Sequence, residues 1–316
     1  MKQTLFTLLL LSTIALVSCR KKGAEQNIKQ YDDAQIQSYI SANGITGMVK
    51  DTIGQDTTGI YYKVLTSPKN VSTIIADTSK ISFVFTLKSF DGKYSSTDTI
   101  ENHYDGYVGH ITADALPLGL RLAILNNLKY RGYSMRILIP SHLAYGLYGY
   151  GSGSTENTSS RISGNQCLDY YVHVINNING PVADNQATYD DQTIQQYMKH
   201  ENFTGYTKTA TGLYYKIIDP GTGTAFINQN STLEATYTGM ILNNVQFDSG
   251  NNGADSVSLE VPDLRPGMQE ALTHAVKGTL MSMILPSALG YGETGSTGIP
   301  VNSCLRFEFQ VVDVTP

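Results

Sequence analysis

The residue types that carry out covalent or metal chemistry are present in this chain, but not at the spacings that such chemistry needs. There is no GxSxG nucleophile turn, no HExxH pair and no Cys/His cluster at ligand spacing, so no hydrolytic or metal site is predicted. The run GYGETG at 290–295 fits the dinucleotide pattern GxGxxG. It does not open a helix within a βαβ unit, and we therefore discard that interpretation. The six histidines are scattered, and we expect each at the surface or in a loop.

The chain contains two copies of one unit. A repeat of this length predicts tandem domains and not a solenoid of short repeats. The 316 residues allow two domains, and a hydrophobic content of 41% lets both copies bury a core. Three pairs of segments show the repeat: YDDAQIQSYI at 31–40 with YDDQTIQQYM at 189–198, GIYYKVL at 59–65 with GLYYKII at 212–218, and RILIPSHLAYG at 136–146 with SMILPSALGYG at 282–292.

The first copy is the longer one. The offset between the copies falls from 153 residues at Gly59 and Gly212 to 137 at Cys167 and Cys304. Most of the excess lies between Gly146 and Cys167, in a stretch rich in Gly, Ser and Thr that predicts a mobile surface loop. The two cysteines occupy equivalent positions, which favours a buried small apolar residue in each domain over a disulfide between them.

Hydrophobic periodicity predicts the same elements in each copy. Apolar residues at 36, 39 and 40, and again at 194, 197 and 198, indicate a short amphipathic helix that opens each unit. The acidic pairs 32–33 and 190–191 are expected at the start of these helices, where carboxylates are favoured. In the second copy we expect a strand at 235–242, one helix at 266–276, and strands at 279–285 and 304–314. The predicted fold class is α+β, an antiparallel sheet around one short helix in each domain.

The first 18 residues have the features of a cleaved signal peptide. Lys2 precedes an apolar run at 5–17 that is too short for a membrane span of about 20 residues. Leu-Val-Ser-Cys at 16–19 resembles a bacterial lipobox, which implies that Cys19 becomes the acylated first residue of the mature protein. Two acyl chains, such as palmitate, would anchor the chain where one would not. An ordinary secretory signal with a chance cysteine is the alternative.

The segments that follow define the predicted organisation. Residues 19–28 would be the lipidated cysteine and a linker, although the basic run at 20–22 could also contact anionic headgroups. The first domain is expected at 29–179, a linker at 180–186 and the second domain at 187–316. Arginine, not aspartate, after Cys19 resembles the outer-membrane sorting pattern, so we expect a lipid-anchored envelope protein that faces the periplasm.

Charge excludes one class of partner. The net charge is −5, and no Lys/Arg cluster lies within either copy, so binding to nucleic acid is not expected. The oligomeric state stays open, because the helix at 31–43 could pack on its own domain or on a second chain.

The second copy resembles the FKBP-type peptidyl-prolyl cis–trans isomerases. The resemblance runs from about 213 to 314 and rests on four ordered pieces: ATYTGMILNNVQFDSG at 235–250, LRPGMQEAL at 264–272, LPSALGYGETGSTGIP at 285–300 and LRFEFQVVDV at 305–314. It implies isomerisation of Xaa-Pro bonds in polypeptide clients. The barrier of about 18–20 kcal/mol comes from amide conjugation, so neither a cofactor, a metal nor a nucleophile is implied.

The resemblance also assigns roles to nine residues of the second copy. The catalytic walls would be Tyr237 and Phe247, with Asp248 accepting hydrogen bonds and Tyr291 donating its hydroxyl to a substrate carbonyl. Substrate-binding roles would fall to Leu264, the backbone N–H of Arg265, Met268 as the floor, Ile299 on the loop side and Phe307 beside the walls. The family usually has Trp at the floor, and this chain contains none, so we expect a looser pocket.

The first copy has lost part of this set. In the first copy, Phe85 is aligned with Tyr237, Tyr94-Ser95 with Phe247-Asp248, Leu120 with Met268 and Tyr170 with Phe307. Tyr145 is aligned with Tyr291 and is identical to it. The pocket aspartate is gone, and we expect a degenerate domain with little or no activity.

The predicted function is therefore that of an envelope isomerase that assists the folding of proline-containing clients, acting mainly through its second domain. The alternatives are a non-catalytic peptide-binding or chaperone-like lipoprotein, and a structural subunit of an envelope assembly.

Overall fold

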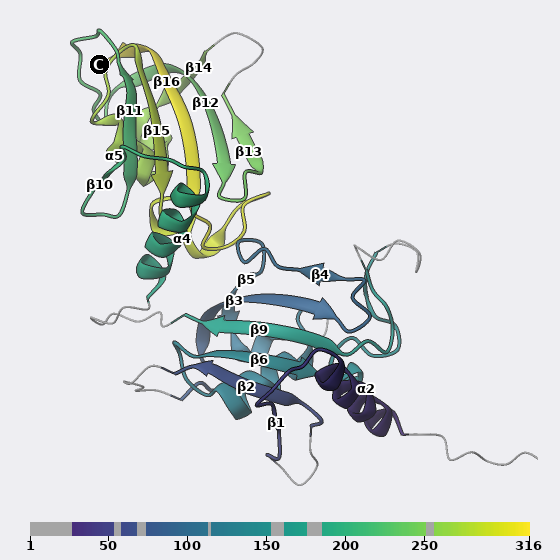
Figure 1. The fold of residues 1–316 in the computed structure, drawn as a ribbon. Coiled ribbons are helices and arrows are strands. Elements are labelled where there is room, and N and C mark those ends of the chain that lie inside the picture. Colours follow the sequence, from purple (N-terminus) through teal and green to yellow (C-terminus); the bar gives the residue numbers. More distant parts are fainter. Residues whose placement is uncertain are drawn as a thin grey trace, which may run out of the picture.

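The computed structural model describes residues 27–53, 58–67, 74–112, 115–152, 161–175, 185–250 and 256–316. Within these residues the chain forms two seven-stranded antiparallel sheets, one in each copy of the repeat (Figure 1). The predicted α+β class is confirmed. The signal segment, Cys19 and most of the linker at 180–186 lie outside the described residues. No helix in the described parts of the chain is long and apolar enough to cross a membrane.

The first domain begins with a helix and continues into its sheet, whose strand order is β1-β2-β6-β9-β3-β4. The remaining strand, β5, pairs with β3 on the same edge as β4. The helices are α2 (Ile28–Ala42) and α3 (Leu118–Ala123), which continues as a π-helical turn η2 (Ile124–Leu128). The strands are β1 (Val49–Lys50), β2 (Tyr61–Thr66), β3 (Lys80–Ser89), β4 (Ser95–Ser96), β5 (His103–Tyr107), β6 (Ser134–Ile139) and β9 (Leu168–Val174).

The second domain repeats this topology with the order β10-β11-β15-β16-β12-β13 and β14 on β12. Its helices are α4 (Gln186–His200) and α5 (Pro266–Leu272). Its strands are β10 (Thr207–Lys208), β11 (Tyr214–Pro220), β12 (Thr232–Ile241), β13 (Gln246–Ser249), β14 (Val257–Glu260), β15 (Thr279–Leu285) and β16 (Leu305–Thr315).

Short 3-10 turns join these elements: η1 (Val108–His110) and η3 (Ser141–Leu143) in the first domain, and η5 (Val261–Asp263), η6 (Ser287–Leu289) and η7 (Gly292–Thr294) in the second. The expected strands are found, with ends shifted by no more than a few residues. The helix expected at 266–276 ends earlier, at Leu272, because the chain then turns: Ala275 donates its N–H to the carbonyl of Leu272 over 3.0 Å.

Each sheet is buried on both faces. Along β15, Met283 and Leu285 pack with α5 into the main core, while Ile284 between them packs with Ile194 of α4 on the opposite face. Successive side chains of a strand point to opposite sides, so a strand covered on both faces can carry consecutive apolar residues, as Met283, Ile284 and Leu285 do. The α2 helix packs on its own sheet in the same way, through Ile36.

The acidic pairs do not lie where the sequence suggested. The helices begin earlier, with Asn27 and Asn185 as N-caps, so the carboxylates come after the first turn. Asp32 is buried and accepts from the Ser141 hydroxyl at 2.7 Å. Asp190 is buried too, and accepts from both the N–H and the hydroxyl of Ser287. The prediction of a helix-start role was wrong, because these aspartates fix each helix to the 3-10 corner after a proline.

Two further expectations are corrected and one is confirmed. The segment predicted as a mobile loop contains a small hairpin of β7 (Tyr150–Gly151) and β8 (Arg161–Ile162), while its residues 153–160 lie outside the described part. His103 is not a surface or loop residue but lies partly buried in β5, against the second domain. Cys167 and Cys304 are buried and unbridged, as predicted.

Candidate functional site

Three aromatic rings of the second domain meet on one side of its sheet. Tyr237 lies on β12, Phe247 on β13 and Phe307 on β16, three strands that are neighbours in the sheet. The rings of Phe247 and Phe307 meet edge to face with centroids 5.7 Å apart, and the Tyr237 ring lies 6.3 Å from that of Phe307. Phe307 is buried, whereas Tyr237 and Phe247 are partly exposed, so two rings present a surface that an apolar group can cover.

A glycine makes this aromatic packing possible. A Cβ at Gly239 would lie 2.8 Å from the Phe307 ring and 2.9 Å from the Phe247 ring. Gly239 follows Tyr237 by two positions on the same strand, so it shares that face. The sequence reasoning missed this residue, and the spacing Tyr-x-Gly on a predicted strand was the signal that could have found it.

Asp248 fixes one of the walls. Its carboxylate accepts two hydrogen bonds, one from the Tyr237 hydroxyl at 2.9 Å and one from the backbone N–H of Ser249 at 2.8 Å. Burial of the Tyr237 ring, together with the adjacent carboxylate, raises the pKa of Tyr237 to about 12. The hydroxyl thus stays protonated and keeps donating to Asp248, which leaves the ring face as the part that Tyr237 can offer to a ligand.

Tyr291 packs against one of these walls. Its ring meets that of Phe247 edge to face at 6.5 Å, and the Arg265 guanidinium lies over it, 4.9 Å from the centroid. Among the described residues no group bonds to the Tyr291 hydroxyl. The guanidinium contact was not foreseen, and it places a charged group where the sequence suggested only a backbone donor.

The start of α5 supplies a second donor. Arg265 is the N-cap residue, with an extended backbone, and its carbonyl accepts the N–H of Met268 at 2.9 Å. The first N–H groups of a helix have no partner within that helix. Within the described part of the chain the Arg265 N–H is also unpaired, so it can bond to a ligand carbonyl.

The remaining predicted residues lie at the bottom and sides of this group. Met268 and Ile299 are each about 4% exposed and belong to the main core, while Leu264 is partly exposed beside them. Ile299 is held by a pair of backbone bonds with Ser296, both 2.9 Å. Seven of the nine predicted residues therefore share one hydrophobic cluster, and the other two, Asp248 and Arg265, contact its members.

The corresponding region of the first domain is closed by its own side chains. The Tyr145 hydroxyl donates to the Ala115 carbonyl at 3.1 Å, and its ring stacks on Tyr150 of the hairpin at 4.6 Å. Burial raises the pKa of Tyr145 to about 12. Tyr170 and Phe85 are buried as well, with ring centroids 5.7 Å apart. The hydroxyl that is free in the second domain is thus engaged in the first.

The backbone donor is missing from the first domain for a covalent reason. The residue that caps α3, at the position of Arg265 in the second domain, is Pro117, which has no N–H. The loop frame is nevertheless shared. Asn165 donates its N–H to Gly146 at 2.7 Å, as Asn302 does to Gly292 at 2.8 Å. The first copy keeps the architecture, but its tyrosine hydroxyl is engaged and its backbone donor is absent.

The chemical repertoire of the site is that of binding. In the described ranges no three His, Cys, Asp or Glu side chains gather in a way that could hold a metal ion. The walls are aromatic and aliphatic, and the two polar groups without a partner among the described residues, the Tyr291 hydroxyl and the Arg265 N–H, are donors. Such a site suits an apolar ring flanked by carbonyl oxygens.

Comparison with known proteins points to the same chemistry. Residues 223–312 match the family described as FKBP-type peptidyl-prolyl cis-trans isomerase. The FKBP-type peptidyl-prolyl cis-trans isomerase FkpA of Buchnera aphidicola subsp. Baizongia pistaciae is 31% identical over 132 residues, covering 42% of this chain and 51% of that protein. FkpA of Escherichia coli K12 is 30% identical over 134 residues, covering 42% and 48%.

The chain spans about half the length of these curated relatives. Among solved structures, the crystal structure of FkpA from Escherichia coli is 28% identical with a TM-score of 0.37, covering 42% of this chain and 61% of that one. Residues 223–312, which match the family, contain the whole aromatic site. By sequence and by site, the second domain is similar to the FKBP-type peptidyl-prolyl cis–trans isomerases, FkpA among them.

Proposed function

We propose that this protein is a peptidyl-prolyl cis–trans isomerase whose activity resides in the second domain. The observation that carries the proposal is the pairing of exposed aromatic walls with two unpaired donors, the Tyr291 hydroxyl and the Arg265 N–H. The family match over residues 223–312 supports it. The substrates are proline-containing segments of polypeptide clients.

Catalysis of this reaction requires only that the site bind and orient the substrate. Rotation about an Xaa-Pro bond breaks no covalent bond, and its barrier of about 18–20 kcal/mol arises from amide conjugation. A planar amide is more polar than a twisted one, so an apolar pocket formed by Phe247 and Phe307 favours the twisted state. Donors that hold the flanking carbonyls select the chain conformation in which the bond turns. The Tyr237 ring, fixed by Asp248, limits the space that the proline ring can occupy.

The first domain is proposed to lack this activity. Its Tyr145 hydroxyl is engaged, Pro117 offers no N–H, and Tyr150 covers the site. A substrate would have to displace stacked side chains and would then find neither donor.

The location is proposed from the sequence alone. A lipobox-like Leu-Val-Ser-Cys at 16–19 supports acylation of Cys19 and attachment to the envelope, facing the periplasm at the outer membrane. Unaided prolyl isomerisation takes tens of seconds or more, so a tethered isomerase would serve secreted clients. The variant Cys19→Ser should leave the membrane fraction. If it sediments with membranes after a salt wash as the wild type does, the anchor is elsewhere.

Matched wall substitutions test the proposal in the full-length protein. Phe247→Ala removes a wall that is partly exposed, so the fold should survive, and kcat/KM on an Xaa-Pro tetrapeptide should fall at least about tenfold. The control Tyr94→Ala alters the equivalent position of the first domain and should leave the rate within about twofold. Equal losses in the two variants, or no activity in the wild type, would reject the assignment.

A non-catalytic, chaperone-like protein is the second candidate. One observation favours it: beside the closed site of the first domain, Tyr148 is 83% exposed and Leu147 is 68% exposed. Exposed apolar side chains that cluster suit the binding of unfolded segments. Binding of a proline peptide without any increase in its isomerisation rate, together with suppressed aggregation of a proline-free client, would establish this function instead.

A further inference from the structure

We propose that the first domain positions the pocket loop of the second domain, with Asp105 as the principal positioning residue and Lys80 as a minor one. The pocket loop is defined as residues 291–302, which begins with Tyr291 and includes Ile299. The inference rests on the proposed isomerase function. Its physical content, a contact between domains that restrains this loop, can be measured independently of catalysis.

The pocket loop is closed at a neck. Asn302 donates its N–H to the Gly292 carbonyl at 2.8 Å and holds a left-handed backbone with φ of 54°. Asn302 is buried. The neck is thus the bonded pair Gly292 and Asn302. Gly292 follows Tyr291, and Asn302 comes shortly before β16.

Within the loop, short-range bonds join the two ends of the site. The Thr294 hydroxyl donates to the Tyr291 carbonyl at 2.9 Å. Ser296 and Ile299 exchange both backbone bonds at 2.9 Å. The loop therefore behaves as one unit, and a force applied at its neck acts on Tyr291 and Ile299 together.

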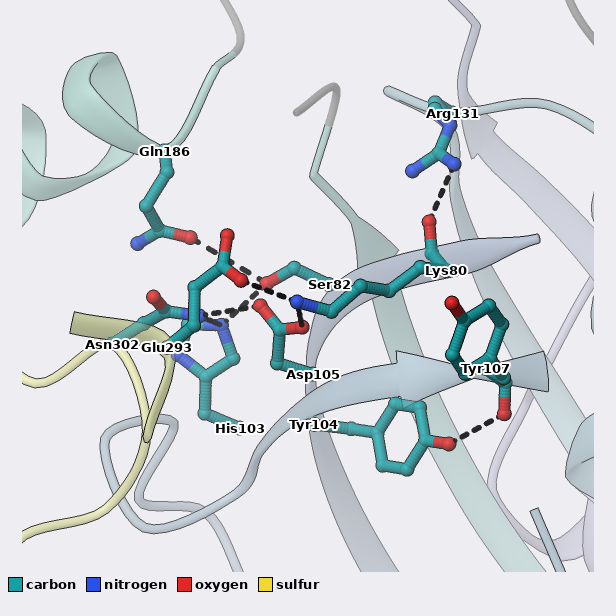
Figure 2. Close-up of polar contacts among 10 residues, drawn as sticks. All are labelled: Lys80, Ser82, His103, Tyr104, Asp105, Tyr107, Arg131, Gln186, Glu293 and Asn302. Carbon is teal, nitrogen blue, oxygen red and sulfur yellow. Dashed lines mark hydrogen bonds and ion pairs between the residues drawn. The ribbon is translucent and has the colours of Figure 1, made fainter. Parts of the chain in front are cut away.

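The first domain contacts this neck with two charged side chains, shown in Figure 2. Asp105 of β5 accepts from the Asn302 side-chain amide at 3.0 Å. The same carboxylate pairs with Lys80 at 3.1 Å, and Lys80 also pairs with Glu293, which follows Gly292 in the loop. One of these contacts falls on Asn302, which closes the loop, and the other on Glu293, next to its bonding partner Gly292.

Burial decides which contact matters more. The Lys80 and Glu293 side chains are 47% and 53% exposed, and exposed ion pairs contribute little to stability. The Asp105 side chain is only 3% exposed, and a buried carboxylate that loses a partner is costly. The Asp105–Asn302 bond is therefore the main restraint.

The surrounding contacts make the two domains meet over a wider area. His103 bonds to Ser82 at 2.7 Å, reaches the Asn302 amide at 3.4 Å, and lies edge-on to Tyr189 with ring centroids 6.3 Å apart. Ile100 packs against both hydrophobic clusters of the second domain. Ile100, His103 and Asn302 line one small cavity where the two domains meet.

A further bond lies at the far end of the same contact. The Asn243 amide of the second domain donates to the Asp98 carboxylate at 2.7 Å. Because this bond joins the turn after β12 to the first domain, it keeps the domains together without touching the pocket loop. Removal of Asp105 is therefore expected to loosen the loop and not to separate the domains.

The test compares three full-length variants on a proline tetrapeptide. Asp105→Ala should raise KM about threefold or more with a smaller change in kcat, because the loop carries binding groups. Asp105→Asn retains an oxygen that can accept from Asn302, so it should restore most of the affinity. The matched control Asp77→Ala breaks an ion pair with Arg121 inside the first domain and should behave like the wild type.

Hydrogen exchange of the pocket loop gives a second readout that needs no catalysis. Asp105→Ala should speed exchange of the amides at 291–302, above all that of Asn302, while Asp105→Asn and Asp77→Ala should not. Unchanged exchange together with unchanged KM in folded Asp105→Ala would overturn the proposal. Faster exchange in Asp105→Ala, combined with a wild type that shows no isomerase activity, would reject the proposed function and keep the positioning role.

Discussion

The two domains share one frame and differ in what their sites expose. Both fix their opening helix through a buried aspartate on a Pro-Ser corner, Asp32 with Ser141 and Asp190 with Ser287. Within the described residues, the second domain leaves a tyrosine hydroxyl and a backbone N–H unpaired. The first domain engages the equivalent hydroxyl and has Pro117 where the N–H would be. The bonds that hold the frame are thus separate from the groups that contact a ligand.

The first domain, whose corresponding region is filled by its own side chains, contacts the second domain through a different edge. In the first domain the strand β5 carries His103 and Asp105 toward the second domain. Through β5, the first domain can restrain residues of the second domain even though its own site is closed.

Separating the domains should reveal the largest difference. Residues 185–316 retain the Asn185 cap and the whole site, while residues 27–175 contain the closed site. We expect kcat/KM on an Xaa-Pro tetrapeptide to differ about a hundredfold in favour of the second piece, since the first lacks both donors. Circular dichroism must show that both pieces fold. Equal rates for two folded pieces would remove the distinction between the copies.

Acid should weaken the contact that His103 makes. Burial lowers the pKa of His103 from 6.5 to about 4, so the imidazole ring stays neutral in the folded protein at neutral pH. The stability from this group is complete above pH 6.5 and is lost as the pH falls toward 4, because the unfolded chain then binds a proton that the folded chain does not. The loss should be about 2.5 kcal/mol near pH 4.5.

Urea unfolding of the full chain at pH 7 and pH 4.5 measures this effect. His103→Gln should show a smaller decrease between the two pH values than the wild type. The neighbouring charged groups, Asp105 and Lys80, remain in both proteins and cancel in the comparison. The same decrease in both proteins would mean that His103 does not titrate against the fold.

The paired substitutions Tyr291→Phe and Tyr145→Phe should have opposite consequences. Loss of the free hydroxyl in the second domain should reduce kcat/KM about threefold to tenfold, the worth of one hydrogen bond, and leave stability unchanged. Loss of the engaged hydroxyl in the first should cost about 1 kcal/mol of stability and leave the rate unchanged. Steady-state kinetics and thermal unfolding of both variants check the pair. A rate loss in Tyr145→Phe would show that the first site is used.

The smallest expected effect concerns the floor of the second site. Met268→Trp adds a large rigid face where the family usually has Trp, and binding of a proline peptide should tighten by about 0.5–1.5 kcal/mol. Met268 is almost fully buried, so overpacking could cost about 1–3 kcal/mol of stability. Calorimetry on the folded variant decides, with Leu120→Met in the first domain as a control that should not alter binding. If the folded variant binds the peptide no more tightly than the wild type, the assignment of Met268 as the floor of the site is rejected.

The sequence determined the features that depend on local order. The repeat, the α+β class, the strand at β15 and the burial of both cysteines could all be predicted, because periodicity and spacing are properties of neighbouring residues. The ordered aromatic motifs also predicted the set that gathers around Phe307. Their roles as catalytic and binding residues stay predictions until the variants are measured.

Tertiary structure alone decided the features that join residues far apart in the chain. Asp32 and Asp190 looked like helix-start residues, yet they bond to serines about 100 positions later. Neither the guanidinium of Arg265 over Tyr291 nor the bond from Asn302 to Asp105, 197 positions apart, has a local sequence signal. Packing of the sheets sets these distances, and burial then makes each of these polar groups take the partner within reach.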